Sequence, residues 1–187
     1  EINPLVISGD RVIAADARLN VDDDAIYRHP ELPQTSEATD LERRVREIGL
    51  AYVQLDGDIA VMANGAGITM ATLDVLQQYG GQPMNFLDAG GGASAEPMAQ
   101  ALEILVSTNP KAIFVNIFGG ITRCDDVARA IVTAREHVGI PIPLVVRLVG
   151  TNQEQGVSLL KENGIEAFSS MNEAAQQAVR LANGGDR

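Results

Sequence analysis

The sequence has 187 residues, of which 45% are hydrophobic, and its formal net charge is −11 at pH 7. This length and apolar content support a folded core and exclude global disorder. The excess of acidic residues argues against a nucleic-acid partner and against an anionic membrane surface, because both need a basic patch. A single cysteine, Cys124, excludes a disulfide framework and a cysteine-based zinc site. We therefore expect a soluble, cytoplasmic protein.

The first residues form two β-rich runs, 3–7 and 11–19, joined by Ser8-Gly9-Asp10. A short polar loop between two such runs is typical of a β-hairpin. The sequence starts inside the first run and without a methionine, so we expect it to be part of a longer protein. Residues 28–40 contain prolines and many polar groups, which predicts a connector before a short helix over 41–50.

From residue 51 onward, apolar strands alternate with helices. The run 52–63 predicts a second hairpin, with Asp56-Gly57 as its turn. Five strand-then-helix units begin at residue 59, and their strands are short and mainly apolar without alternation, which is typical of strands buried on both faces of a parallel sheet. The expected strands are 59–63, 85–89, 112–118, 143–149 and 166–170; the expected helices are 68–79, 95–107 (with Ser94 as its N-cap), 124–138, a segment ending at Lys161, and 172–183. Right-handed crossovers between these units predict an α/β fold with an open, doubly wound parallel sheet of the flavodoxin or Rossmann kind.

Four successive strands end in turns that contain glycine, at 64–67, 90–92, 119–120 and Gly150. Ligands of such sheets bind beyond the carboxyl ends of the strands. Glycine lets the backbone approach a ligand closely, and each turn leads into a helix N-terminus, where free N–H groups favour an anion. Several glycine clusters at one edge of the sheet therefore predict an anion-binding site.

Two other interpretations of the alternating strands and helices, a dinucleotide-binding domain and a receiver-like domain, fit less well. Gly65-x-Gly67-x-x-Met70 after a strand imitates a dinucleotide fingerprint, but the third position must be small and Met70 is not. A receiver-like domain also has five βα units, but it needs an acidic cluster at the strand ends and a lysine after the last strand. Here Asp88 is the only such acid, and Met171 follows the last strand.

Three further residues near the predicted turns have either a structural or a binding interpretation. Asp88 can accept N–H bonds from the glycine turn that follows it as readily as it can bind a ligand. Cys124 stands near a helix start with no histidine placed to activate it, so we interpret it as a packing residue. A cation at a helix N-terminus is unfavourable, so Arg123 is expected to face an anionic ligand or an acidic partner.

In the N-terminal hairpin, Glu1, Asn3 and Asp16 bring two carboxylates and an amide oxygen to one face. Such oxygen ligands suit Mg²⁺, a hard cation. The alternative is a solvated acidic face.

The runs EINPLV, LDGDIAVMANGAG, NFLDAGGGA and VNIFGGITRCD together resemble the β subunit of succinyl-CoA synthetase (succinate–CoA ligase), whose near relative is the β subunit of malate–CoA ligase. The resemblance covers essentially the whole sequence and is weakest over 31–50. It implies that the sequence is the C-terminal part of such a subunit. Residues 1–27 would end an ATP-grasp domain, 28–50 would be a connector with a short helix, and 51–187 would be a flavodoxin-like CoA-ligase domain.

The resemblance also implies an activity. In this family ATP or GTP, succinate and CoA give succinyl-CoA, nucleoside diphosphate and phosphate, through a phosphohistidine on an α subunit that also carries the main CoA site. No catalytic residue is then expected in this sequence. The implied site residues are Asn64, Gly120, Ile121 and Thr122 for the dicarboxylate, Gly65, Ala66 and Gly67 for the phosphoryl group, and Glu1, Asn3 and Asp16 for Mg²⁺.

The sequence leaves several alternatives open. Thr122, the third residue of the implied substrate loop, does not distinguish succinate from malate, and the choice between ATP and GTP belongs to the part not represented here. In a eukaryote the compartment would be the mitochondrial matrix. A different class of function, a non-catalytic CoA-ligase-like module that binds an acidic metabolite or partner, also fits.

Overall fold

The computed structural model describes residues 1–19, 21, 28–29, 31, 38–92 and 95–185. The chain divides into two compact units, Glu1–Glu37 and Ala38–Arg187, which are treated separately below. The expected N-cap Ser94 and most of the expected connector lie outside the described residues. The division into 1–27, 28–50 and 51–187 stays a prediction.

The first unit contains a β-hairpin, as expected. Strands β1 (Leu5–Ser8) and β2 (Arg11–Ala14) pair antiparallel, with Leu5 opposite Ala14 and Ser8 opposite Arg11. Gly9 adopts φ +64° in the turn, a conformation that glycine reaches without steric cost. All eight strand residues are exposed among the residues that the structure describes. A two-stranded hairpin with no packed face is only marginally stable in water.

The second unit is built on a six-stranded sheet with the order β3-β5-β4-β6-β7-β8. Its strands are β3 (Ala51–Gln54), β4 (Ile59–Ala63), β5 (Asn85–Asp88), β6 (Ala112–Gly119), β7 (Leu144–Gly150) and β8 (Ala167–Phe168). Five strands are parallel, and the edge strand β3 is antiparallel to β5. The parallel strands, counted in chain order, lie in the order 2-1-3-4-5, which is the flavodoxin-like order. The expected doubly wound α/β fold is confirmed, with one antiparallel strand added.

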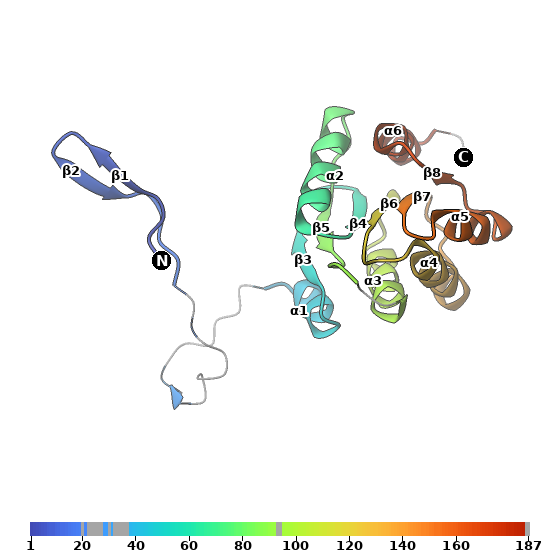
Figure 1. The fold of residues 1–187 in the computed structure, drawn as a ribbon, viewed down its shortest axis with the longest axis horizontal. Coiled ribbons are helices and arrows are strands. Elements are labelled where there is room, and N and C mark those ends of the chain that lie inside the picture. Colours follow the sequence, from blue (N-terminus) through green and yellow to red (C-terminus); the bar gives the residue numbers. More distant parts are fainter. Residues whose placement is uncertain (20, 22–27, 30, 32–37, 93–94, 186–187) are drawn as a thin grey trace. The chain divides into compact units, whose positions relative to one another are not determined.

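Helices cover both faces of this sheet. They are α1 (Asp40–Glu47), α2 (Ala66–Gln78), α3 (Ala95–Ser107), α4 (Cys124–Val138), α5 (Gln153–Glu162) and α6 (Met171–Ala182). Figure 1 shows α2 and α6 over one face and α1, α3 and α4 over the other, with α5 beside α4. Each face has its own core: Phe114, Leu76 and Val179 belong to the α2/α6 core, and Val115 and Leu102 to the other. Among the described residues no helix is both long and apolar enough to span a membrane.

The predicted hairpin over 52–63 is wrong. β3 pairs with β5, with Ala51 opposite Asp88, and β4 lies between β5 and β6 with all five residues buried. Gly57 is needed for a close approach of two chain segments, because a Cβ there would lie 2.2 Å from the Pro83 carbonyl oxygen. Burying the continuously apolar β4 at the centre of the sheet outweighs the local turn preference of Asp56-Gly57.

β4 and β5 are joined by a side chain where their backbones diverge. The two strands pair at Ala63 and Asp88. Toward the start of β5, the buried Asn85 donates from Nδ2 to the Val61 carbonyl oxygen (2.7 Å), and its Oδ1 accepts from the Val61 N–H (3.0 Å). The Asn85 amide therefore takes the place of a backbone peptide in the sheet.

Candidate functional site

The strand order places the turns after β4 and β6 side by side, at the switch point where ligands of such sheets bind. Asn64, directly after β4, donates from Nδ2 to the Phe118 carbonyl oxygen and accepts from the Phe118 N–H at Oδ1, both at 2.9 Å. These bonds continue the β4–β6 pairing beyond Ala63 and Asn116. A primary amide has two donors and two acceptor sites, so Asn64 keeps one of each for a ligand.

α2 starts at this switch point, where the Asp88 carboxylate accepts the N–H of its N-cap residue. Its N-cap is Gly65 (φ +98°), and within the described residues no side chain caps it, nor does its first turn contain an acid. The N–H groups of Ala66 and Gly67 have no acceptor inside the helix. The Gly65 N–H is already bound, because it donates to Asp88 Oδ1 (2.5 Å). Asp88 also accepts from the Gly90 N–H (2.6 Å), so its expected role as an acceptor for the glycine turn is confirmed.

The implied substrate loop after β6 has three residues with different surroundings. Thr122 is 2% exposed, and its Oγ1 accepts from the Gly92 N–H at 3.0 Å, which ties this loop to the turn after β5. The Ile121 side chain is 84% exposed. The Gly120 carbonyl oxygen accepts from Thr151 Oγ1 (3.0 Å). The hydroxyl of Thr122 is therefore used to position the loop.

At three glycines of the carboxyl edge, neither the backbone conformation nor the packing of the described residues explains why a side chain is absent. Fifteen of the 18 glycines either adopt positive φ or would place a Cβ within 3.1 Å of another atom. Gly67, Gly91 and Gly120 do neither, since an added Cβ would meet nothing within 4 Å. Gly67 is the second residue of α2, and Gly91 and Gly120 stand in the turns after β5 and β6. The open space in front of all three lies at the edge where a ligand is expected to approach.

The start of α4 is neutralised within its own helix. Arg123 ion-pairs with Asp125 (3.2 Å) and Asp126 (3.7 Å), so it does not need the anionic ligand that the sequence led us to expect. The hydrogen bond from Arg123, followed by one from Asn152, lowers the pKa of Asp125 to about 2 against the cost of its desolvation. Cys124 is fully buried, and this burial raises the pKa of its thiol, as a packing role requires.

The candidate Mg²⁺ residues lie at the open end of the hairpin. Asn3 Nδ2 donates to Glu1 Oε1 (3.1 Å), which leaves the Asn3 amide oxygen available, and Asp16 Oδ1 accepts from the Ala17 N–H (2.8 Å). The strand pairing continues through a bond from the Ala15 N–H to the Pro4 carbonyl oxygen. Asp16 therefore lies across from Asn3. Among the described residues no group of three His, Cys, Asp or Glu side chains forms a metal cluster, but carboxylate and amide oxygens are a donor set that fits Mg²⁺.

Sequence reasoning missed the polar residues inside apolar strands. Asn116 in β6 is fully buried, donates to Thr72 Oγ1 (2.7 Å) and accepts from Arg147 Nη1 (3.0 Å). Asn85 plays the comparable part between β4 and β5. The signal was present in the sequence, because a polar residue in a buried strand must find hydrogen-bond partners.

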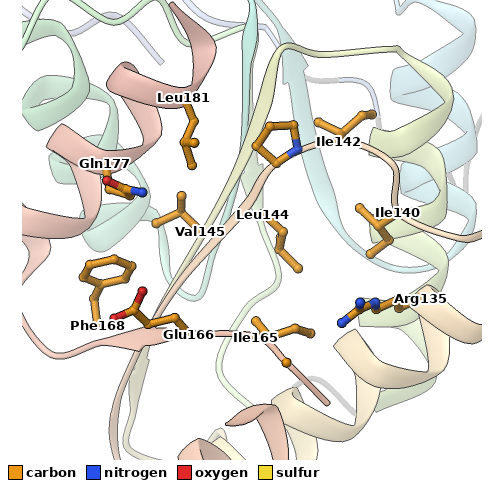
Figure 2. A pocket seen from close by; sticks show the side chains of 12 residues that line it. Arg135, Ile140, Ile142, Leu144, Val145, Ile165, Glu166, Phe168, Gln177 and Leu181 are labelled. Carbon is orange, nitrogen blue, oxygen red and sulfur yellow. The ribbon is translucent and has the colours of Figure 1, made fainter. Parts of the chain in front are cut away.

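A cavity of about 260 Å³ lies away from the carboxyl edge, beside the start of β7. Figure 2 shows its apolar lining, which includes Leu144, Ile142 and Leu181, with Arg135 and Glu166 at its border. None of the expected site residues lines it.

This chain is similar to known proteins over most of its length. The model of the CoA-ligase family matches residues 62–181. The succinate–CoA ligase [ADP-forming] subunit beta 2 of Archaeoglobus fulgidus is 49% identical over 97% of this chain and 50% of its own length. The corresponding subunit beta of Ignicoccus hospitalis is 51% identical over 97% of this chain and 49% of its own length. The chain thus spans about half the length of these curated relatives.

Among solved structures, ATP citrate lyase from Methanothrix soehngenii, in complex with citrate and coenzyme A, matches with a TM-score of 0.71. The match covers 97% of this chain and 53% of that chain at 21% identity. At this identity the match supports the fold alone.

Proposed function

This chain belongs to the CoA-ligase family, and from that premise we propose that it is the C-terminal part of the β subunit of a succinate–CoA ligase. The complete enzyme would convert succinate, CoA and a nucleoside triphosphate to succinyl-CoA, nucleoside diphosphate and phosphate, by way of a phosphohistidine on an α subunit. The names of relatives at 47–51% identity support this proposal. Because the chain spans half of those relatives, it would act only within the complete subunit and with its partner.

The observation that carries the proposal is the set of three glycines at the carboxyl edge. Gly67, Gly91 and Gly120 need neither positive φ nor close packing, so their lack of a side chain is best explained by a ligand that approaches the backbone. Backbone N–H groups and helix dipoles hold anions without titrating. Acyl-phosphate chemistry on a dicarboxylate needs such fixed donors more than it needs a general base.

For the dicarboxylate, we assign Asn64 and the loop Gly120-Ile121-Thr122. The spare N–H of the Asn64 amide is a donor for a carboxylate, and Gly120 leaves its loop open to a ligand. Malate remains the second candidate substrate, because a hydroxyl group on the acid would meet the same open loop.

For the phosphoryl group, we assign the first N–H groups of α2, those of Ala66 and Gly67. The Gly65 N–H contributes by holding the turn through Asp88. Asp88 takes the N–H of the N-cap, and among the described residues the first turn of the helix itself contains no acid. The N–H groups of Ala66 and Gly67 would stabilise a phosphoryl dianion as it arrives and leaves.

For Mg²⁺, the fitting residues are Glu1, Asn3 and Asp16. The ion would shield the charge of the nucleotide phosphates. The exposed hairpin supports the idea that it belongs to an ATP-grasp domain, since its strands need a packing surface beyond the described residues.

The experiment is Ala66→Pro in the complete enzyme. Ala66 is the first residue of α2, and Gly65 before it has ψ 135°. Proline is tolerated at the first helical position, and a preceding residue outside the α region avoids a clash with its ring, so this variant removes one N–H and keeps the helix. We expect turnover to fall roughly 10- to 100-fold, since a hydrogen bond to a charged group contributes about 1.5–3 kcal/mol.

The matched control is Asp40→Pro, at the first position of α1, where the preceding residue, Thr39, is likewise outside the α region (ψ 163°). Turnover with succinate and with malate is measured for both variants. Equal turnover in the two variants would contradict the phosphoryl assignment. The acid with the higher kcat/KM in the parent enzyme identifies the substrate.

A further inference from the structure

A chain of four hydrogen bonds runs from β7 to the start of α2, and every donor in it points the same way. Arg147 Nη1 donates to Asn116 Oδ1 (3.0 Å), and Asn116 Nδ2 donates to Thr72 Oγ1 (2.7 Å). The Thr72 hydroxyl then donates to the Ile68 carbonyl oxygen (2.7 Å), in the first turn of α2. The same peptide group carries the Thr69 N–H, which donates to the Gly65 carbonyl oxygen (3.0 Å).

The series of hydrogen bonds ends at the peptide group between Gly65 and Ala66. The N–H of this peptide group is one that the proposed function assigns to the phosphoryl group. Its carbonyl oxygen accepts a second bond, from Thr69 Oγ1 (2.9 Å). Hydrogen bonds aligned head to tail polarise one another, and in a buried setting a cation at the donor end strengthens them further. A carbonyl that accepts two bonds makes the N–H of its own peptide group a better donor.

The cation at the far end has an environment that fits this role. Within the described residues Arg147 makes no ion pair with a carboxylate, whereas Arg123, Arg129 and Lys111 each have at least one. Burial lowers the pKa of Arg147. Its Nε donates to the Ser169 carbonyl oxygen (2.9 Å), and its guanidinium carbon lies 6.0 Å from the centre of the Phe118 ring. The guanidinium is therefore fixed in place while its charge stays uncompensated.

We propose that Arg147 is a positioning residue that acts through Asn116 and Thr72 on the Ala66 N–H, and so strengthens phosphate binding at the start of α2. This inference rests on the proposed function of that N–H. It gives the buried polar residues of β6 and β7 a task at the site, although none of them reaches the carboxyl edge itself. We refer to Arg147, Asn116, Thr72, Ile68 and Thr69 as the relay.

The test uses the complete enzyme and interrupts the relay at its middle. Thr72→Val removes the hydroxyl at nearly constant volume, and Thr72→Ser restores it. Arg147→Met removes the cation. In the direction that consumes succinyl-CoA, nucleoside diphosphate and inorganic phosphate, we expect Thr72→Val and Arg147→Met to raise the KM for inorganic phosphate roughly 2- to 30-fold. The KM for succinate, measured in the other direction, stays at the parent value.

Asn85→Leu provides the control for stability, because Asn85 is another buried asparagine of the same sheet but bonds to Val61 outside the relay. It is expected to lower the melting temperature while leaving the phosphate KM unchanged. The inference is overturned if Thr72→Val keeps the parent phosphate KM, or if Thr72→Ser is as impaired as Thr72→Val. An effect of Ala66→Pro without one of Thr72→Val refutes the relay alone, whereas no effect of Ala66→Pro refutes the phosphoryl assignment as well.

Discussion

The side chain of Asn85 offers a direct test of how this sheet is held together. It is fully buried, and both of its hydrogen bonds go to the backbone of Val61, at 2.7 and 3.0 Å. Leucine has the same branched skeleton, with two methyl groups in place of the amide oxygen and nitrogen, so Asn85→Leu removes these bonds and adds some volume to the core. The Val61 N–H and carbonyl groups then remain buried without their partner.

The cost follows from those two groups. A buried donor or acceptor left without a partner costs about 1–3 kcal/mol, so the two together cost about 2–6 kcal/mol. For a unit the size of Ala38–Arg187, each kcal/mol lowers the melting temperature by about 2–4 °C. We therefore expect a fall on the order of 10 °C.

The assay is urea unfolding of the chain followed by far-UV circular dichroism, with thermal melting beside it. Asn172→Ala is the matched control, because Asn172 is exposed in α6 and such a change alters stability by less than about 0.5 kcal/mol. If Asn85→Leu is no less stable than Asn172→Ala, then Asn85 does not act as part of the sheet, and the reasoning fails.

Two further predictions concern the turns. Gly120→Ala should keep the parent melting temperature, since the added Cβ meets nothing within 4 Å, and should raise the dicarboxylate KM of the complete enzyme. By contrast, Gly150→Ala should not fold stably, because the added Cβ would lie 2.0 Å from the Gly119 carbonyl oxygen. A destabilised Gly120→Ala would contradict this assignment. The pKa of Asp125 is lowered to about 2, so the ionised carboxylate stabilises the fold at any pH above the ordinary pKa of an aspartate. This stabilisation is lost as the pH falls through about 2. Asp125→Asn should therefore have a lower urea midpoint than the parent at pH 7, and the two midpoints should converge near pH 2. An equal difference between the midpoints at both pH values would refute this role of Asp125.

The arrangement of the parallel strands could be predicted from sequence because it depends on local patterns. Continuous apolar runs such as 59–63 and 112–118 indicate strands buried on both faces, and the helix over 124–138 is found as expected. The partner of β3 could not be predicted, because Asp56-Gly57 gives a strong local turn signal while β3 pairs with a strand 30 residues away in sequence. Choosing between them requires the packing of the whole sheet.

The candidate site was predictable as an edge of the sheet but not as a set of contacts. Glycine turns gave its location, and the motif resemblance gave Asn64 and Gly120. The sequence contains no sign that Asn64 bonds to Phe118, because those two residues are brought together only by the neighbouring positions of β4 and β6. For the same reason the link from Arg147 through Asn116 to Thr72 becomes visible only in the folded chain.

The proposed site would bind anions in a chain with a net charge of −11. Charges on the surface are screened within about 8 Å at physiological ionic strength, so the groups at the edge itself decide the local potential. Two acids close to the assigned residues of the second unit are already engaged. Asp88 accepts from the Gly65 and Gly90 N–H groups, and Asp125, three residues after Thr122, is paired with Arg123. What remains exposed at the start of α2 is N–H, which carries partial positive charge and does not titrate. Under this proposal the geometry of the backbone donors would select the anion, and the acidic surface elsewhere would not oppose it.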